Sequence, residues 1–302
     1  MNKFNLSIGK NYFTNVYGLG RSFLALNTLT TLFFNDIYIL YPEYLFDKVL
    51  RGTFIEKINL FLLFDYSELW EAKLISIVIL LWVIVGVFPR ITGLLHWWVS
   101  VSFFSSAILV EGGDQITANL TFLLIPITLM DNRKFHWNQD TSVNYYKNVI
   151  AYFSFFLIEL QVAVLYLQAG VEKLYKLEEW RNGTAIYYWF NQSIFGAPDW
   201  ILTWLNPLLT NPIFVSIGSW IPIFLELSLF GMLFSAKVDR FKLLPVAIMF
   251  HFLIAMIHGL PSFFLAMCGA VVLYLIPKDK FLSFDIIKLS TKRLSQLIYK
   301  IK

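Results

Sequence analysis

Charged residues are scarce in this chain. Only 15% of its 302 residues are Asp, Glu, Lys or Arg, whereas 58% are hydrophobic, and the mean hydropathy is +0.63. A soluble domain of this length needs more polar residues to cover its surface, so the composition excludes an ordinary soluble domain. It predicts an all-α multi-pass protein of the cell membrane.

Three further absences limit the chemistry, the partners and the domain organisation that the chain can have. The chain has a single cysteine, Cys268, so an internal disulfide or thiol–disulfide exchange within the chain is excluded. The net charge is only +4 and no basic run is typical of nucleic-acid binding, so no nucleic-acid partner is expected. No internal repeat, low-complexity segment or cleavable signal peptide is evident. We therefore expect one transmembrane domain over residues 1–277 and a basic tail over residues 278–302.

The apolar residues gather in ranges of about 20, the length that crosses a bilayer core of about 30 Å. Eight such ranges predict eight transmembrane helices: 15–35, 73–89, 91–110, 115–131, 148–171, 213–235, 242–259 and 261–277.

Lys and Arg predict the orientation of these helices, because cytoplasmic loops are enriched in both. With the N-terminus inside, every short inner segment carries Lys or Arg, whereas the short outer loops 111–114 and 259–261 carry none. Both termini are therefore predicted to lie inside, with the tail 278–302 as a basic amphipathic segment on the anionic inner leaflet. The long segments 36–72 and 172–212 then face outward, and their mixed charges and aromatics predict interfacial helices or a cap over the bundle.

The most informative stretch is 157–183, an apolar helix that carries several polar groups. They are Glu159, Gln161, Gln168, Glu172 and Lys173. A charge deep in a membrane helix costs roughly 2.5–3.5 kcal/mol on insertion scales, so such groups must have partners, reach water or act.

Within this stretch, Glu159, Tyr166 and Lys173 are seven residues apart and share one helix face. Burial disfavours the charged form of a lysine in general, so Lys173 is a candidate base, with Gly170 leaving room beside it. The alternative is that Lys173 snorkels to the headgroups and Glu172 is solvated. Because Lys173 lies where the span ends, we expect its loss to leave no buried unpaired carboxylate.

Four further ionisable groups need partners or roles. His251 is mid-span and must find a partner, and Glu226 on the preceding span is predicted to hydrogen-bond to it, either for chemistry or only for packing. No metal site is predicted, because the sequence offers no third ligand at a suitable spacing. Asp114, in the EGGD turn, is a candidate helix cap or substrate contact. Arg21 either snorkels inward or forms a salt bridge, with Glu159 as one possible partner.

These pieces together resemble the HTTM domain, the membrane domain shared with vitamin K-dependent gamma-carboxylase. The resemblance rests on the pattern Q161-x6-Q168-A-G-V-E-K173-L followed by W180-x2-G183, with support from the EGGD turn, from Glu226 preceding His251 and from the PSFF sequence that opens the last span. In the carboxylase, the second of two lysines after AGV deprotonates vitamin K hydroquinone. The resemblance implies that Lys173 is the corresponding base, with Glu172 in place of the first lysine, and that a quinone or hydroquinone is the cofactor.

The N-terminal sequence NYFTNVYGLGRSFLALNTLTTLFFND more specifically resembles SdpB-type membrane proteins, which act in maturing a sporulation-delaying-type antimicrobial peptide. This implies two partners, an SdpA-like soluble protein and a peptide toxin precursor. The former would supply what the carboxylase's large extramembrane domain does. A non-enzymatic peptide-binding, immunity or export component stays open, although a transporter would favour internal repeats.

The candidate site residues divide into two groups. The catalytic candidates are Lys173, Glu226 and His251. The substrate-binding candidates are Glu159, Tyr166, Gln168, Glu172, Trp180 and Asp114.

Overall fold

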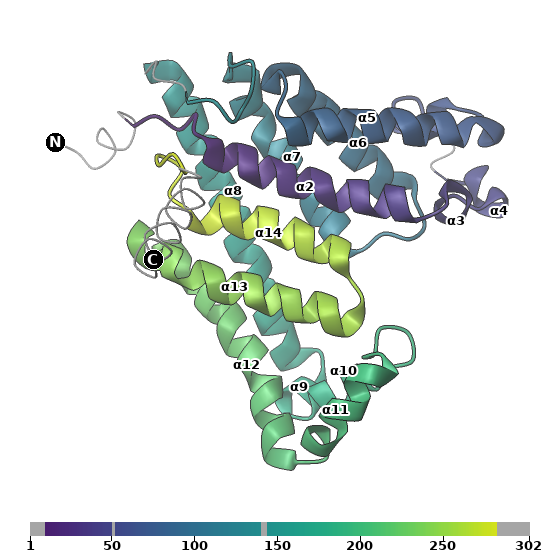
Figure 1. Cartoon of the computed structure of the whole chain (residues 1–302), viewed down its shortest axis with the longest axis vertical. Helices are drawn as coiled ribbons and strands as arrows, with labels where there is room; N and C mark the ends of the chain where they lie inside the picture. Colours follow the sequence, from purple (N-terminus) through teal and green to yellow (C-terminus); the bar gives the residue numbers. More distant parts are fainter. Residues whose placement is uncertain (1–9, 50–51, 140–143, 283–302) are drawn as a thin grey trace, which may run out of the picture.

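The structure is a computed structural model that describes residues 10–49, 52–139 and 144–282. These residues are almost entirely helical, which confirms the all-α class (Figure 1). The basic tail predicted over 278–302 lies mostly outside the described residues.

Each of the eight predicted ranges coincides with a long helix. They are α2 (Asn15–Phe34), α5 (Leu69–Val85), α6 (Pro89–Ser106), α7 (Gly112–Met130), α8 (Tyr145–Tyr175), α12 (Pro212–Gly231), α13 (Lys237–His258) and α14 (Pro261–Leu275). In the described part of the chain, three segments are long and apolar enough to cross a membrane: Tyr145–Tyr175, Pro212–Phe234 and Asp239–His258. The chain therefore has the helices of a membrane protein.

Helix α14 is short but lies in the middle of the molecule. Every residue from Ala266 to Leu275 is buried. It packs on α2 through glycines on both helices, because Gly20 lies against Leu273 and Gly269 lies against Leu24. Figure 1 shows α14 between α2 and α13, which agrees with its burial on all sides.

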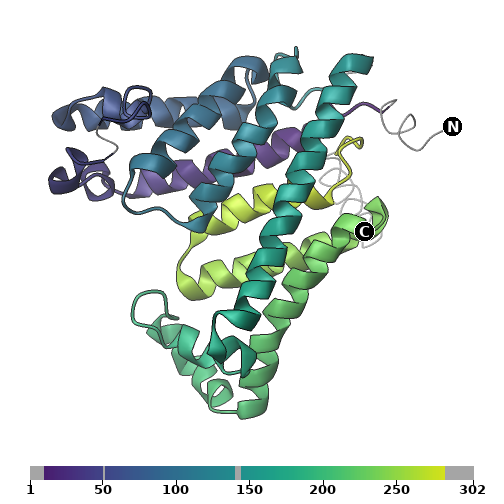
Figure 2. The ribbon, with the colours of Figure 1, turned by 180° about the vertical axis from the view of Figure 1, so that it is seen from behind.

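Helix α8 is the longest element, with 31 residues. At a rise of 1.5 Å per residue it is about 46 Å long, so it extends beyond the other helices. Figure 2 shows α8 running from one end of the molecule to the other, with α12 beside its second half. The two helices approach closely where Gly170 faces Leu227.

The two long segments predicted to face outward contain short helices, as expected. The first holds α3 (Ile37–Leu40), α4 (Glu43–Phe46), η1 (Leu60–Leu63) and η2 (Tyr66–Glu68), and the second holds α9 (Glu178–Arg181), α10 (Ala185–Phe190) and α11 (Asp199–Leu209). In Figure 1, helices α3 and α4 lie at the right-hand edge of the molecule, whereas α9, α10 and α11 lie at its lower end. Trp204 on α11 is 80% exposed, which suits a membrane-interface residue.

The EGGD turn is a helix cap, as one of its two readings predicted. The Glu111 and Asp114 side chains form a capping box at the start of α7. Asp114 is buried and also accepts a hydrogen bond of 3.1 Å from Asn27 Nδ2. The cap satisfies backbone N–H groups that the first turn of a helix leaves unpaired.

Arg21 is fully buried, and the predicted alternative of a salt bridge with Glu159 is wrong. Its guanidinium lies 3.3 Å from His136 Nδ1 and donates to Thr92 Oγ1 at 3.2 Å. Burial, together with the positive charge of Arg21, lowers the pKa of His136 to about 2. A neutral imidazole can therefore accept from Arg21 in place of a carboxylate.

Candidate functional site

Glu159, Tyr166 and Lys173, the three polar residues predicted to share one face of α8, each contact a different set of side chains. Glu159, Tyr166 and Lys173 are bonded to side chains of α12, α13 or the segment after α14. The seven-residue spacing places them on one inward face, so α8 supplies a polar edge at three depths.

Lys173 and Glu226 form the contact nearest the C-terminal end of α8. The ammonium Nζ donates to both carboxylate oxygens at 2.7 Å and also lies 3.3 Å from the carbonyl oxygen of Ala169. The Lys173 side chain is 19% exposed and that of Glu226 is 8% exposed. The expectation that losing Lys173 would leave no buried unpaired carboxylate is therefore wrong, because Glu226 depends on it.

Tyr166 and His251 form the next contact inward, at 2.8 Å between the tyrosine hydroxyl and Nε2. The predicted hydrogen bond between Glu226 and His251 is wrong. A buried carboxylate is stabilised more by an ammonium that donates to both of its oxygens than by a neutral ring. Tyr166 is instead the hydrogen-bond partner of His251 Nε2. Each pair nevertheless has one member on α8, Lys173 or Tyr166, and these two lie within two turns of each other.

Trp180 covers the outer side of this cluster. Lys173 Nζ lies 5.3 Å from the centre of its ring, within the range of a cation–π interaction. The ring is buried and packs with Ile223 and Leu227 of α12. The structure therefore places Trp180, a substrate-binding candidate, beside Lys173.

Two buried polar atoms of this region have no hydrogen-bond partner among the described residues: Trp180 Nε1 and His251 Nδ1. Such orphans are uncommon because leaving a buried donor unpaired costs about 1–3 kcal/mol. Both atoms belong to one cluster, which consists of Lys173, Glu226, Tyr166, His251 and Trp180. We call these five residues the Lys173 cluster.

Gln168 and Glu172 lie on the outer surface of α8, apart from the Lys173 cluster. Glu172 accepts from Gln168 at 3.1 Å and from Lys176 at 2.6 Å. The hydrogen bond to Glu172 raises the pKa of Lys176. The structure therefore gives the Gln168 side chain a partner on its own helix, one turn away.

Glu159 forms a separate ion cluster fourteen residues before Lys173, about 21 Å along the helix. Its two oxygens accept from Arg240 Nη1 and from Lys278 Nζ, each at 2.5 Å. The sequence-based prediction used Arg240 and Lys278 only for the topology, and their role as partners of Glu159 was missed. The useful signal was that a mid-helix carboxylate needs cations at the same depth.

Asp114 belongs to neither cluster. Its described bonds are to Asn27 and to the Glu111 backbone, so it remains a cap in this structure. Asn27, which also donates to Thr117 Oγ1 at 3.0 Å, was missed because a lone Asn in an apolar run has no spacing pattern.

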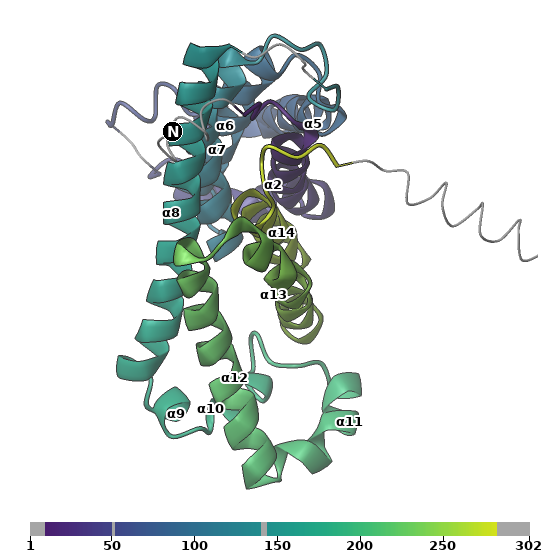
Figure 3. The same cartoon turned by 90° about the vertical axis from the view of Figure 1, so that its left-hand side faces the viewer.

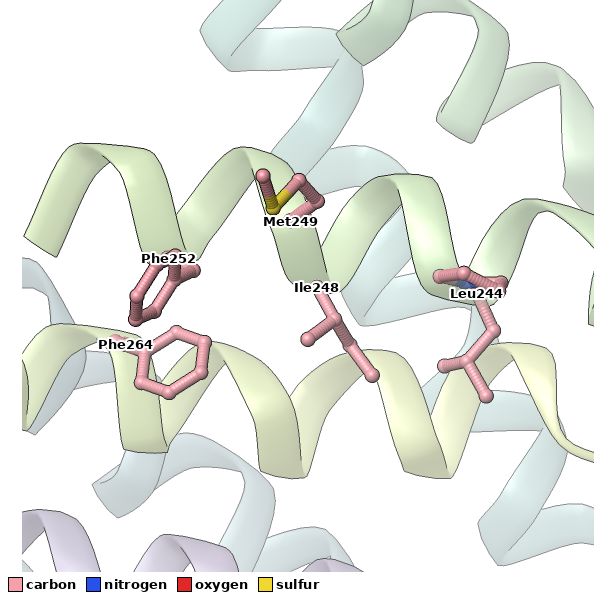
Figure 4. Close-up of a pocket in the computed structure, with 6 residues that line it drawn as sticks. Leu244, Ile248, Met249, Phe252 and Phe264 are labelled. Carbon is pink, nitrogen blue, oxygen red and sulfur yellow. The ribbon is translucent and has the colours of Figure 1, made fainter.

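A hollow lies elsewhere, between α13 and α14 (Figure 4). It has a volume of about 430 Å³ and is lined only by apolar side chains: Leu244, Pro245, Ile248, Met249, Phe252 and Phe264. A smaller one adjoins Glu159, Arg240 and Lys278. The sequence also predicts a pocket that is walled by the spans 148–171, 213–235 and 242–259 and roofed by residues 172–212, and this pocket stays a prediction.

Comparison with known proteins gives two full-length relatives, both from Bacillus subtilis strain 168. The chain is 38% identical over 287 residues to the uncharacterized protein YitO, covering 92% of this chain and 91% of that protein. It is 36% identical over 271 residues to the sporulation-delaying protein SdpB, covering 88% of this chain and 83% of that protein. No protein-family model and no solved structure matches. At this identity and coverage, the chain belongs to the family of SdpB and YitO.

Proposed function

We propose that this chain is an integral membrane protein that acts in the maturation of a secreted antimicrobial peptide, with Lys173 as a base near the outer membrane face. The observation that carries the proposal is the buried contact between Lys173, in the AGVEK motif, and Glu226. The relationship to SdpB supports the pathway, because SdpB is named a sporulation-delaying protein.

Glu226 gives Lys173 a route to the free amine. An ammonium cannot accept a proton, so Lys173 must first release one. Both Glu226 oxygens lie 2.7 Å from Nζ, and in a poorly solvated site an ion pair can neutralise itself by passing a proton from ammonium to carboxylate. Lys173 then takes a proton from a bound substrate, and Glu226 holds the proton that Lys173 released.

The other members of the Lys173 cluster position the bound molecule. His251 Nδ1 and Trp180 Nε1 are buried without described partners, which fits the hydrogen-bonding groups of a quinone or hydroquinone. When bound, a hydroquinone would supply the hydroxyl group from which Lys173 takes a proton. Tyr166 holds the His251 ring through Nε2, and the Trp180 ring shields Lys173 from bulk water.

The proposal extends to the surroundings of the site. Eight helices cross the membrane with both termini inside, so that the Lys173 cluster lies in the outer half beneath residues 172–212 as part of an HTTM-type domain. A peptide precursor is the substrate, and an SdpA-like soluble partner presents it from the outer side.

A non-enzymatic role has one observation in its favour. The bidentate contact between Lys173 and Glu226 is also what a purely structural ion pair between α8 and α12 would show. In that case the protein binds, exports or gives immunity to the peptide, and Lys173 holds the helices together.

Replacement of Lys173 by Arg separates the two functions. Arg keeps the positive charge and can bind Glu226 with two hydrogen bonds, but it cannot act as a base near neutral pH. We expect Lys173→Arg to abolish mature peptide in a producing strain while membrane levels of the protein stay normal. Mature peptide would be measured by mass spectrometry of the culture medium, and the protein by immunoblot of membranes.

The matched control is Lys176→Arg, three positions further along the same helix in an exposed ion pair. It should leave production unchanged. Normal production by Lys173→Arg would exclude a base at position 173 and favour the non-enzymatic role.

A further inference from the structure

The segment from Glu178 to Pro198 lies at the outer end of the Lys173 cluster. It contains α9, α10 and the loop that follows, and we call it the outer flap. Figure 3 shows this region at one end of the molecule, near the ends of α8 and α12 and apart from the other helices. The flap is attached on two sides, and the two attachments differ in kind.

On the α12 side the flap is packed closely. Gly183 has a φ of +71°, and a Cβ built on it would lie 2.8 Å from Ser216 Oγ. The backbone N–H of Ile186 donates to Ser219 Oγ at 3.2 Å, and the Ile186 side chain lies against Gly218. Backbone contact of this kind leaves no room for sliding, so this side is fixed.

On the α13 side the flap is held mainly by one residue, His258. Its Nδ1 donates to the backbone carbonyl of Phe195 at 2.5 Å, and its ring meets Trp189 and Phe190 edge to face at 6.2 and 6.0 Å. The hydrogen bond is exposed to solvent. Exposed hydrogen bonds contribute little net stability, so this side can open far more readily than the other.

The face of α13 behind this contact leads to the Lys173 cluster. His251, Ala255 and His258 are four and three residues apart and therefore share one face of the helix. His251 is 3% exposed, and its Nδ1 has no described partner. The flap itself contributes Trp180 to the cluster, and the ring of Trp189 lies 6.3 Å from that of Trp180.

We propose that the outer flap is a gate, fixed on α12 and latched to α13 by His258. Opening of the latch would expose the Ala255 face of α13 and admit a ligand to His251 and Lys173 between the flap and α13. The inference rests on the proposed function only in taking the Lys173 cluster as the ligand site.

Cysteine accessibility tests the gate on the purified protein. Cys268 is buried, and its replacement by Ala gives a background without a native thiol. Ala255→Cys then reports on the face behind the latch through its rate of reaction with N-ethylmaleimide. We expect His258→Ala to raise that rate about fivefold to tenfold, the scale set by one hydrogen bond. His258→Asn, which keeps a donor near the Nδ1 position, should stay closer to the wild-type rate.

Met256→Cys is the control reporter, since Met256 is next in the chain but 44% exposed. Its rate should not change with His258→Ala. Equal rates at Ala255→Cys with and without His258 would overturn the gate. A similar rise at both reporters would also overturn it, because α13 would then be loosened as a whole.

The labelling needs no peptide and no catalysis, so its result is separate from that of the Lys173→Arg experiment. A failed gate leaves the base at Lys173 untouched. A failed base leaves the labelling rates of the two reporters unchanged.

Discussion

At the scale of single residues, the molecule is shaped by how each buried charge finds a partner. Glu226 pairs with Lys173, and Glu159 pairs with Arg240 and Lys278. Among the described residues, the hydrogen-bond partners of Arg21 are the neutral groups of His136 and Thr92. Breaking a buried pair from one side is costly because the remaining charge stays desolvated. The stability of this protein should therefore depend on these pairs as units.

Removal of Lys173 tests that dependence. We expect Lys173→Ala to lower the free energy of unfolding by roughly 3–5 kcal/mol, because Glu226 is left buried and unpaired. The double variant Lys173→Ala/Glu226→Ala should lose much less than the two single changes added together. Thermal or SDS denaturation in detergent, followed by tryptophan fluorescence, would measure both.

Lys176→Ala is the control for this series, because its ion pair with Glu172 is exposed and should contribute little. Strict additivity of the Lys173 and Glu226 changes would count against an energetic contact between them.

At the scale of elements, glycines decide how closely the helices approach. Gly86 ends α5 with a φ of +85°, and a Cβ built on it would lie 2.5 Å from His136 Cδ2. Gly18 of α2 faces the same ring from another side. The buried His136 therefore fills the space that these two glycines leave, and it joins α2 and α5 to the loop after α7.

A pair of glycine substitutions isolates this packing effect. Gly86 and Gly259 both end helices with positive φ, but nothing lies within 4 Å of a Cβ built on Gly259. Gly86→Ala should therefore destabilise the protein by about 1–3 kcal/mol more than Gly259→Ala, since overpacking adds to the backbone strain. Parallel unfolding curves would show the difference, and equal losses would mean that His136 moves aside without cost.

At the scale of the whole molecule, the orientation in the membrane remains a prediction. Its basis is the charge asymmetry between the short loops, and both termini are expected inside.

Reporter fusions test the orientation directly. Alkaline phosphatase fused at residue 112 should be active, because that turn is expected outside. At residue 302, which is expected inside, an alkaline phosphatase fusion should be inactive and a GFP fusion should be fluorescent. An active phosphatase at residue 302 would mean that the number of spans is not eight.

The sequence by itself determined the helical class and the positions of the eight long helices, because each apolar range carries its own signal of length and hydropathy. The capping of α7 and the inward stripe on α8 follow from spacing along one helix, so they too could be predicted. Tertiary structure alone decided that Glu226 binds Lys173 and not His251, and that Glu159 binds cations from α13 and the segment after α14. Those choices depend on the relative depth and rotation of helices far apart in the chain, which the spacing within one helix does not encode.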